Sequence, residues 1–241
     1  MPVPPSTVPA PTGAATPSPA SPVPPERAPA EKHGLSRRRI LEAALELADA
    51  EGLEALSMRR LGAILGVEAM SLYHHFPSKG ALLDGLVELV MSQVPLPEEL
   101  TPDWEGLLRR GFAEFRRLML AHRAVFPLVA TRPVADPEAL APVARAFAVL
   151  HAAGFTPREA CSAWTTLIAY VFGYVDCEIS GIGEASRGNR MWGLVSEHQD
   201  PAFTPLRLSQ QTAMEWDDDA EFEVGLGAVI SGLRARLASS G

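Results

Sequence analysis

The sequence predicts an all-α protein, and three features support this. Apolar residues recur at three- and four-residue steps through most of residues 36–238. The strict apolar and polar alternation that marks a half-buried strand is absent from the sequence. Glycine, proline and small capping residues divide the chain into segments of ordinary helix length. We therefore expect a head of three short helices followed by a larger helical body.

The first two predicted helices have clear starts and ends. Ser36 is a suitable N-cap for a helix that ends at Gly52, and Ser57 caps a shorter helix that ends at Gly66. Each has the apolar stripe that an amphipathic helix presents to a core. The residues expected to face inward are Ile40, Leu41, Ala44, Leu45, Leu47 and Ala48 in the first helix and Met58, Leu61 and Ile64 in the second.

Two further helices are expected before the body. One begins near Glu68 and stops before Pro77, and Ser78 caps the next, which runs to Pro95. The same signals then divide the rest of the chain. The predicted segments are a helix from Trp104 to Met119, a short segment 122–130, helices 136–153 and 157–180, a polar Gly-rich stretch 181–215, and a last helix 217–237.

The beginning of the chain has the composition of a disordered leader. Eleven of the 22 prolines fall in residues 1–31, which contain no aromatic residue. Such a segment has too little apolar surface to form a core and favours polyproline II conformations. We therefore divide the chain into a disordered tail (1–33), a head (34–80), a linking helix (78–94) and a body (95–241).

Composition and the cysteines narrow the class of protein. Asp, Glu, Arg or Pro interrupts every apolar run before it reaches the length of a membrane span, so no membrane partner is expected. The first residues lack the pattern of a secretory signal, which predicts a cytoplasmic protein. Cys161 and Cys177 lie in one helical stretch, too far apart for a disulfide, and are expected to be buried.

The charge distribution singles out the head. The whole chain has a net charge of −8, but residues 32–79 sum to +1 while residues 80–241 sum to −8. Only the head escapes the acidity that would repel a polyanion. The Arg37-Arg38-Arg39 run at its start is either a solvated helix end or a source of attraction for phosphate.

Within the head, two short helices joined by Leu65-Gly66-Val67 have the spacing of a helix-turn-helix. Gly66 permits the tight turn, and the second helix can place outward side chains in the major groove of DNA. The run SMRRLGAILGVEAMSLYHHFPSKGALLDGL resembles the signature of the TetR family of transcriptional regulators. The resemblance implies base contacts from Ala69, Met70 and Ser71, phosphate contacts from Tyr73, His74 and Lys79, and a backbone or base contact from Arg59.

The body resembles the C-terminal domain of tetracycline-repressor-class regulators. The matching pieces are DWEGLLRRGFAEFRRLMLAHR, the loop Thr131-Arg132-Pro133, HAAGFTPREACSAW and EFEVGLGAVISGLRARL. This resemblance implies a homodimer in which the helix 157–180 and the last helix form a four-helix bundle with their symmetry mates. The interface residues expected on the last helix are Phe222, Leu226, Val229, Ile230 and Leu233.

The interior of such a body is expected to hold a small-molecule effector, lined by aromatic and apolar side chains. The candidates are Phe112, Phe115, Met119, Leu128, Trp164, Ile168, Phe172, Tyr174 and Trp192. Tetracycline-magnesium is not the expected effector, because the His that the tetracycline repressor places just before the Thr-Arg-Pro loop to bind the magnesium chelate falls here on Leu128, which cannot ligate a metal. Cys177 or Glu178 lies near the position of that protein's acidic residue late in the long helix, and the His that it uses near the end of its fourth helix falls on about Pro95. No metal and no cofactor are expected.

These features predict a DNA-binding regulator rather than an enzyme. Adjacent His74 and His75 point about 100° apart on a helix and cannot share a metal, and no nucleophile elbow or phosphate-binding loop occurs. The preferred hypothesis is a dimeric repressor that an effector releases from an approximately palindromic operator. The alternative is an activator, or a ligand-independent DNA-binding protein, with the same fold.

Overall fold

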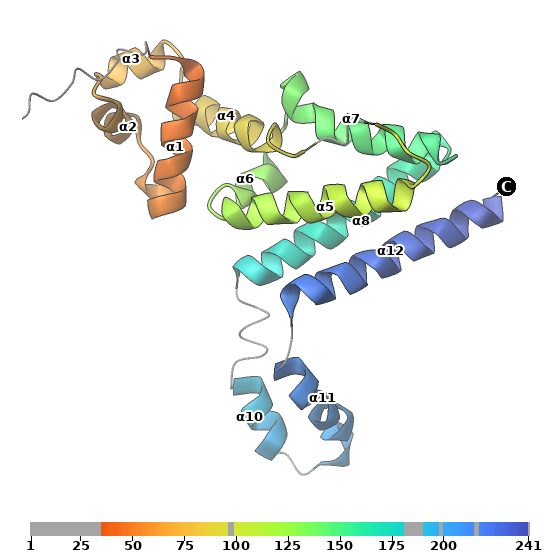
Figure 1. Ribbon diagram of the computed structural model, residues 1–241. Helices are drawn as coiled ribbons and strands as arrows, with labels where there is room; N and C mark the ends of the chain where they lie inside the picture. Colours follow the sequence, from red (N-terminus) through yellow and green to blue (C-terminus); the bar gives the residue numbers. More distant parts are fainter. Residues whose placement is uncertain (1–34, 96–98, 181–189, 198–199, 215–216, 241) are drawn as a thin grey trace, which may run out of the picture. The chain divides into compact units, whose positions relative to one another are not determined.

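A computed structural model describes residues 35–95, 99–180, 190–197, 200–214 and 217–240. Within these ranges the regular structure is entirely helical, which confirms the predicted fold class (Figure 1). The expected disordered tail, residues 1–33, lies outside the described residues. None of the described helices is long and apolar enough to cross a membrane.

The head is formed by α1 (Arg37–Glu51), the 3-10 turn η1 (Leu53–Ala55), α2 (Met58–Leu65) and α3 (Ala69–Tyr73). The predicted caps are present: the hydroxyl of Ser36 accepts a hydrogen bond from the backbone of Arg39, and that of Ser57 from Arg60, each at 3.2 Å. These bonds satisfy amide groups that the first turn leaves without a helical partner.

The turn between α2 and α3 depends on two glycines. Gly66 has a φ of +69°, in the left-handed region where a side chain is disfavoured. A Cβ atom on Gly62 would lie 2.8 Å from the carbonyl oxygen of Val67, so the two helices approach too closely for any side chain at this position. Ile64 was predicted to face inward, but it is 53% exposed, because Met58, Leu61 and Gly62 form the buried face of α2.

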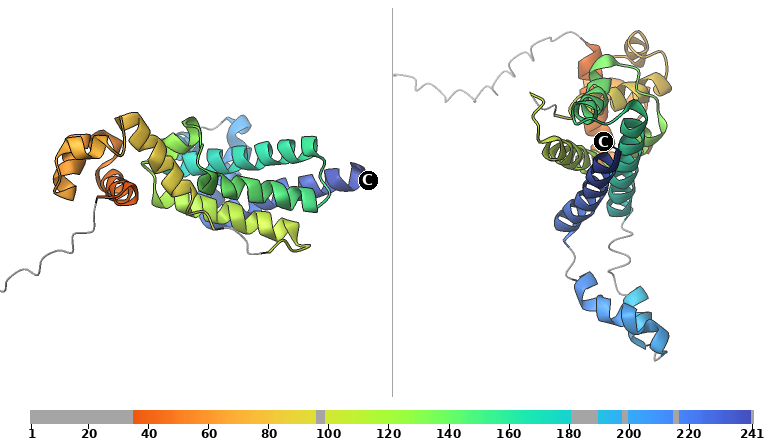
Figure 2. Two further views of the ribbon diagram at one scale, coloured as in Figure 1. Left: turned by 90° about the horizontal axis from the view of Figure 1, so that it is seen from above. Right: turned by 90° about the vertical axis from the view of Figure 1, so that its right-hand side faces the viewer.

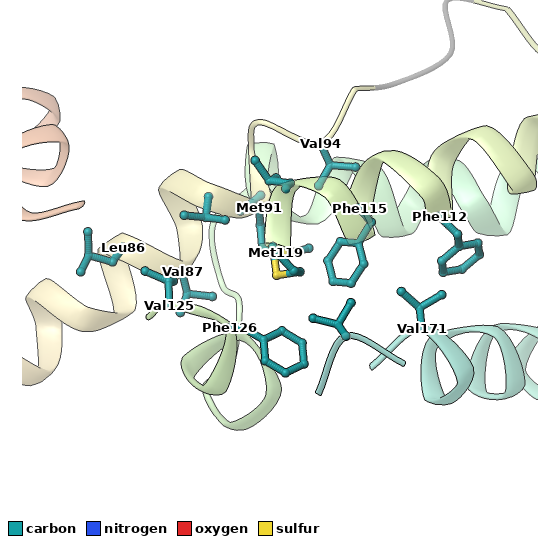
Figure 3. Close-up of a cluster of buried hydrophobic side chains, with 14 of the residues drawn as sticks. Leu86, Val87, Met91, Val94, Phe112, Phe115, Met119, Val125, Phe126 and Val171 are labelled. Carbon is teal, nitrogen blue, oxygen red and sulfur yellow. The ribbon is translucent and has the colours of Figure 1, made fainter. Parts of the chain in front are cut away.

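The helix α4 (Lys79–Met91) extends from the head into the body, as Figure 2 shows from above. The body contains α5 (Trp104–Ala121), α6 (Phe126–Thr131), α7 (Pro137–Ala152), α8 (Pro157–Ile179) and α12 (Asp218–Ser240). Figure 3 shows Leu86, Val87 and Met91 of α4 beside Met119 and Phe126 in a shared cluster of buried side chains. The linking helix is therefore part of the core of the body.

The remaining described helices lie in the stretch that the sequence showed only as polar. They are α10 (Arg190–Glu197), the 3-10 turn η2 (Pro201–Phe203) and α11 (Thr204–Met214), and α10 contacts α11. Residues 181–189 and 215–216 lie outside the described part.

Candidate nucleic-acid interface and internal cavity

The short helix α3 divides its side chains between the core and solvent. Leu72 and, just beyond the helix, Phe76 are fully buried, as expected for the side chains that hold α3 on the head. On the other side, Met70 is 66% exposed and Tyr73 is 42% exposed. Large hydrophobic side chains this exposed on a short helix leave an outer face available for contact with another molecule.

The other predicted contact residues differ in exposure. Arg59, His74 and Lys79 are exposed, whereas Ala69 and Ser71 are half-buried. Lys79 is in the first turn of α4, and its Nζ lies 3.4 Å from the carbonyl oxygen of Leu53. Because helix N-termini favour anions, this position suits a phosphate contact.

Arg37 and Arg38, for which the sequence allowed either a solvated helix end or attraction of phosphate, have partners within the chain. Arg37 donates to the carbonyl oxygen of His75 at 3.1 Å, and its guanidinium lies 4.2 Å from the ring centre of Phe76. The Nε atom of Arg38 lies 2.7 Å from a carboxylate oxygen of Glu42. Arg37 therefore holds the end of α3 against α1, a role that residue type alone does not reveal.

The body contains an internal cavity of about 210 Å³. Aromatic and aliphatic side chains from α4, α5, α6, α7 and α8 form most of its wall. The lining residues are Met91, Val94, Pro95, Leu107, Leu108, Gly111, Phe112, Phe115, Val129, Val134, Pro142, Val143, Arg145, Ala146, Val149, Trp164, Ile168 and Phe172. Arg145 is the only charged residue among them.

Five of the nine predicted lining residues, Phe112, Phe115, Trp164, Ile168 and Phe172, line this cavity. Three others lie elsewhere. Met119 is fully buried core, Leu128 packs half-buried outside the lining, and Tyr174 donates to the carbonyl oxygen of Asp218 at 3.0 Å. The side chain of Trp192 lies outside the described residues.

A buried ion pair occupies the end of α8. The Nε and Nη2 atoms of Arg116 donate to the two carboxylate oxygens of Glu178, at 2.8 and 2.6 Å, and its Nη1 donates to Asp219 at 2.6 Å. Burial alone lowers the pKa of Arg116, but the hydrogen bonds to Glu178 and Asp219 outweigh it and raise the pKa above its ordinary value. This network ties α5 to α8 and α12.

The apolar stripe of α12 does not form a free surface. Phe222, Leu226, Ile230 and Leu233 are buried within the single chain, where α12 packs on α8 and α5, and Val229 is half-buried. This chain therefore already covers four of the five residues that the sequence suggested as dimer contacts, and leaves little of their surface for a second copy. The opposite face of α12 is exposed and contains Val224, which is 67% exposed.

A second uncovered face lies on α8. Its exposed residues are small and mostly uncharged, among them Thr166, Ala169 and Gly173. Cys161 and Cys177, expected to be buried, are both exposed free thiols on this helix. Free cysteine is among the residue types most often buried, so its exposure here is unusual for a surface that stays in water.

A helix-turn-helix head joined through a long helix to a cavity-containing helical body defines a class: DNA-binding regulatory proteins with a separate ligand domain. Comparison with known families agrees. Residues 40–86 match the family described as bacterial regulatory proteins, tetR family, and residues 96–237 match the tetracyclin repressor-like C-terminal domain. The chain belongs to the TetR family of transcriptional regulators.

Several curated regulators are similar to the chain over most of their length. It is 34% identical to an HTH-type transcriptional regulator of Saccharopolyspora erythraea, with 83% of this chain and 85% of that one covered. It is 36% identical to the HTH-type transcriptional repressor DrrR1 of Streptomyces coeruleorubidus, covering 86% and 80%. The class A tetracycline repressor from transposon 1721 of Escherichia coli is 32% identical, covering 84% and 92%.

Solved structures show the same fold. Apo ActR from Streptomyces coelicolor aligns with a TM-score of 0.75 at 28% identity, covering 86% of this chain and 98% of that one. ActR in complex with actinorhodin aligns with a TM-score of 0.73 at 27% identity, covering 85% and 99%.

Proposed function

We propose that the chain is a dimeric repressor whose α3 helices read an approximately palindromic operator and which a small-molecule effector releases from DNA. The observation that carries the proposal is the outward face of α3, where Met70 and Tyr73 are exposed beside Lys79. A helix-turn-helix inserts the second helix of the motif, which is α3 here, into the major groove. The proposed place of action is the cytoplasm, where bacterial operator DNA lies.

Each predicted contact residue receives a role on chemical grounds. Ala69 and Met70 carry no hydrogen-bonding group, so we assign them apolar contacts such as thymine methyls, with Ser71 beside them at base edges. Tyr73, His74 and Lys79 are donors suited to phosphate oxygens. Arg59, exposed on α2, is assigned to the DNA backbone or a neighbouring base.

We assign the homodimer interface to the uncovered faces of α8 and α12. Small residues on α8 would allow the helices of two copies to approach closely. The exposed apolar side chain of Val224 on α12 would be buried in the interface, which is favourable. The exposed thiols of Cys161 and Cys177 fit a surface that a second copy covers. Two heads in one dimer would read two half-sites of one operator.

The cavity between α5, α7 and α8 is the proposed effector site. ActR has been crystallised in complex with actinorhodin, and a variant of the TetR of Acinetobacter baumannii in complex with minocycline, so the fold accommodates small-molecule ligands in those proteins. A tetracycline-magnesium chelate is not the effector proposed here. Leu128 offers no metal ligand, and the Glu178 carboxylate is engaged by Arg116.

Release from DNA requires that the cavity and the head influence each other. The cavity is lined by Met91 at the end of α4, and Arg132 beyond α6 pairs with Asp84 and donates to the carbonyl oxygen of Gly80 at 3.2 Å. A ligand that displaces α4 would change the separation of the two heads. DNA affinity would then fall by the coupling free energy between the two sites.

The experiment that tests this proposal is a reporter fused to the DNA upstream of the chain's own coding sequence. Deleting the chain should raise reporter expression, and restoring the wild-type chain should lower it again. A matched strain carrying Lys79→Ala should remain derepressed at equal protein level. Loss of expression on deletion would indicate an activator and contradict the proposal.

A further inference from the structure

Arg145 is the charged residue among the described residues that line the cavity. The inference drawn from it rests on the proposed effector site and concerns which ligands that site binds. Every other lining residue in the described part of the chain is apolar or aromatic, and none of these residues is an acid. Arg145 is half-buried and its Nε atom is shielded from solvent. Keeping a permanent cation in such surroundings is costly unless an acceptor or an anion lies near it.

The chemistry of the guanidinium suits a carboxylate ligand. Arg145 has an interaction within the chain, but a guanidinium presents five N–H donors in a fixed planar arrangement. That arrangement matches the two oxygens of a carboxylate, which an arginine binds through two parallel hydrogen bonds. None of the described lining residues is an acid, so an anionic ligand would meet no repelling charge from them.

The rest of the wall indicates the shape of the ligand. On this wall the Trp164 ring lies 5.8 Å from Phe112, and Phe172 lies 5.7 Å from Phe115, measured between ring centres. Rings at such distances attract another flat ring through stacked or edge contacts. A cavity of about 150 Å³ holds benzene, and this one, of about 210 Å³, has room for a fused-ring molecule.

We propose that the cavity binds small planar aromatic acids, with Arg145 as the specificity-determining residue that pairs with the carboxylate while the aromatic wall holds the ring. A neutral ring of the same shape would bind only through the wall. The preference for the acid should therefore depend on Arg145 alone. Residues that do not line the cavity should not affect it.

The test compares two probes of the same shape by calorimetry on the full-length chain: 2-naphthoate and its neutral amide, 2-naphthamide. The wild-type chain should bind the carboxylate about tenfold more tightly, the ratio expected for one hydrogen-bonded charge pair. Arg145→Met should remove that preference and leave the affinity for the amide within about twofold. Arg110→Met, a surface arginine of α5 that pairs with Asp103, should retain the preference.

Three outcomes would overturn the proposal: equal affinity of the wild-type chain for the two probes, absence of naphthoate binding, or a preference that survives in Arg145→Met. If Arg145→Met fails to fold, Arg145→Lys gives the second comparison and should keep part of the preference, because it retains the charge without the planar geometry. These measurements contain no DNA. A failure of DNA binding would therefore contradict the proposed repressor without contradicting the proposed ligand class. Equal affinity for the two probes would contradict the ligand class without contradicting DNA binding.

Discussion

Asp49 in the head is hydrogen-bonded to His122 in the body, with 2.8 Å between the Oδ2 and Nδ1 atoms. Asp49 lies in α1 and His122 directly after α5, so the bond joins elements that are far apart in the sequence. Both side chains are largely shielded, at 29% and 18% exposure. This bond connects the head to the body, and the contacts of Arg132 to Asp84 and Gly80 connect the linking helix α4 to it.

A double-mutant cycle should measure this connection. We expect the double variant of Asp49→Ala and His122→Ala to lose less unfolding free energy than the sum of the losses in the two single variants. The difference, which is the coupling energy of the pair, should be about 1 kcal/mol. Urea unfolding of the four proteins provides the measurement. The exposed pair Arg117 and Glu114, at 68% and 42% exposure, is the control and should couple by less than about 0.5 kcal/mol. Equal coupling in the two pairs would contradict this role.

Lys79 is expected to contact phosphate rather than bases. Lys79→Ala should therefore weaken binding by a similar factor on every duplex and reduce the salt slope of the affinity by about 1. Fluorescence anisotropy at several salt concentrations measures both quantities. Arg110→Ala should leave them unchanged. A loss restricted to one DNA sequence would instead assign Lys79 to base recognition.

Gly62→Ala should damage the head. The added Cβ would meet the backbone oxygen of Val67 at 2.8 Å, and backbone cannot rotate away as a flexible side chain can. We expect a loss of about 1–3 kcal/mol in unfolding free energy together with weaker DNA binding. Gly193→Ala in α10, whose Cβ would meet nothing within 4 Å, is the matched control and should not destabilise the chain. Full DNA affinity in Gly62→Ala would show that α2 and α3 can separate without cost.

The proposed dimer interface predicts the effect of a charge on α12. Val224→Glu would place an unpaired carboxylate where two copies meet, so the protein should sediment as a monomer. Ala121→Glu, at an exposed position at the end of α5, should leave the assembly intact. Analytical ultracentrifugation distinguishes the two results. A Val224→Glu protein that remains dimeric would place the interface elsewhere.

Local signals explain why the head could be predicted. Ser36, Ser57 and Ser78 each cap a helix, and Gly66 ends one, so these boundaries depend only on nearby residues. The exposure of Ile64 could not be predicted in this way, because it depends on the packing of α3 over Gly62.

The body shows the limit of periodicity. The sequence pattern assigned the stripe containing Phe222 and Leu226 to the dimer interface, because periodicity does not reveal that α8 of the same chain covers it. The aromatic residues of α5 and α8 indicated the cavity. The contribution of α7 to the cavity, including that of Arg145, was not predicted. A single arginine in an apolar helix produces no periodic signal that would place it on a cavity wall.

The central claim is that two copies of α3 read one operator. A hydroxyl-radical footprint of the full-length chain on the DNA upstream of its coding sequence tests it most directly. We predict a protected segment with approximate twofold symmetry, its half-sites separated by about 10 base pairs or a multiple of that spacing, and its loss in Lys79→Ala. Absence of protection at moderate salt by a chain that circular dichroism shows to be helical would contradict the claim.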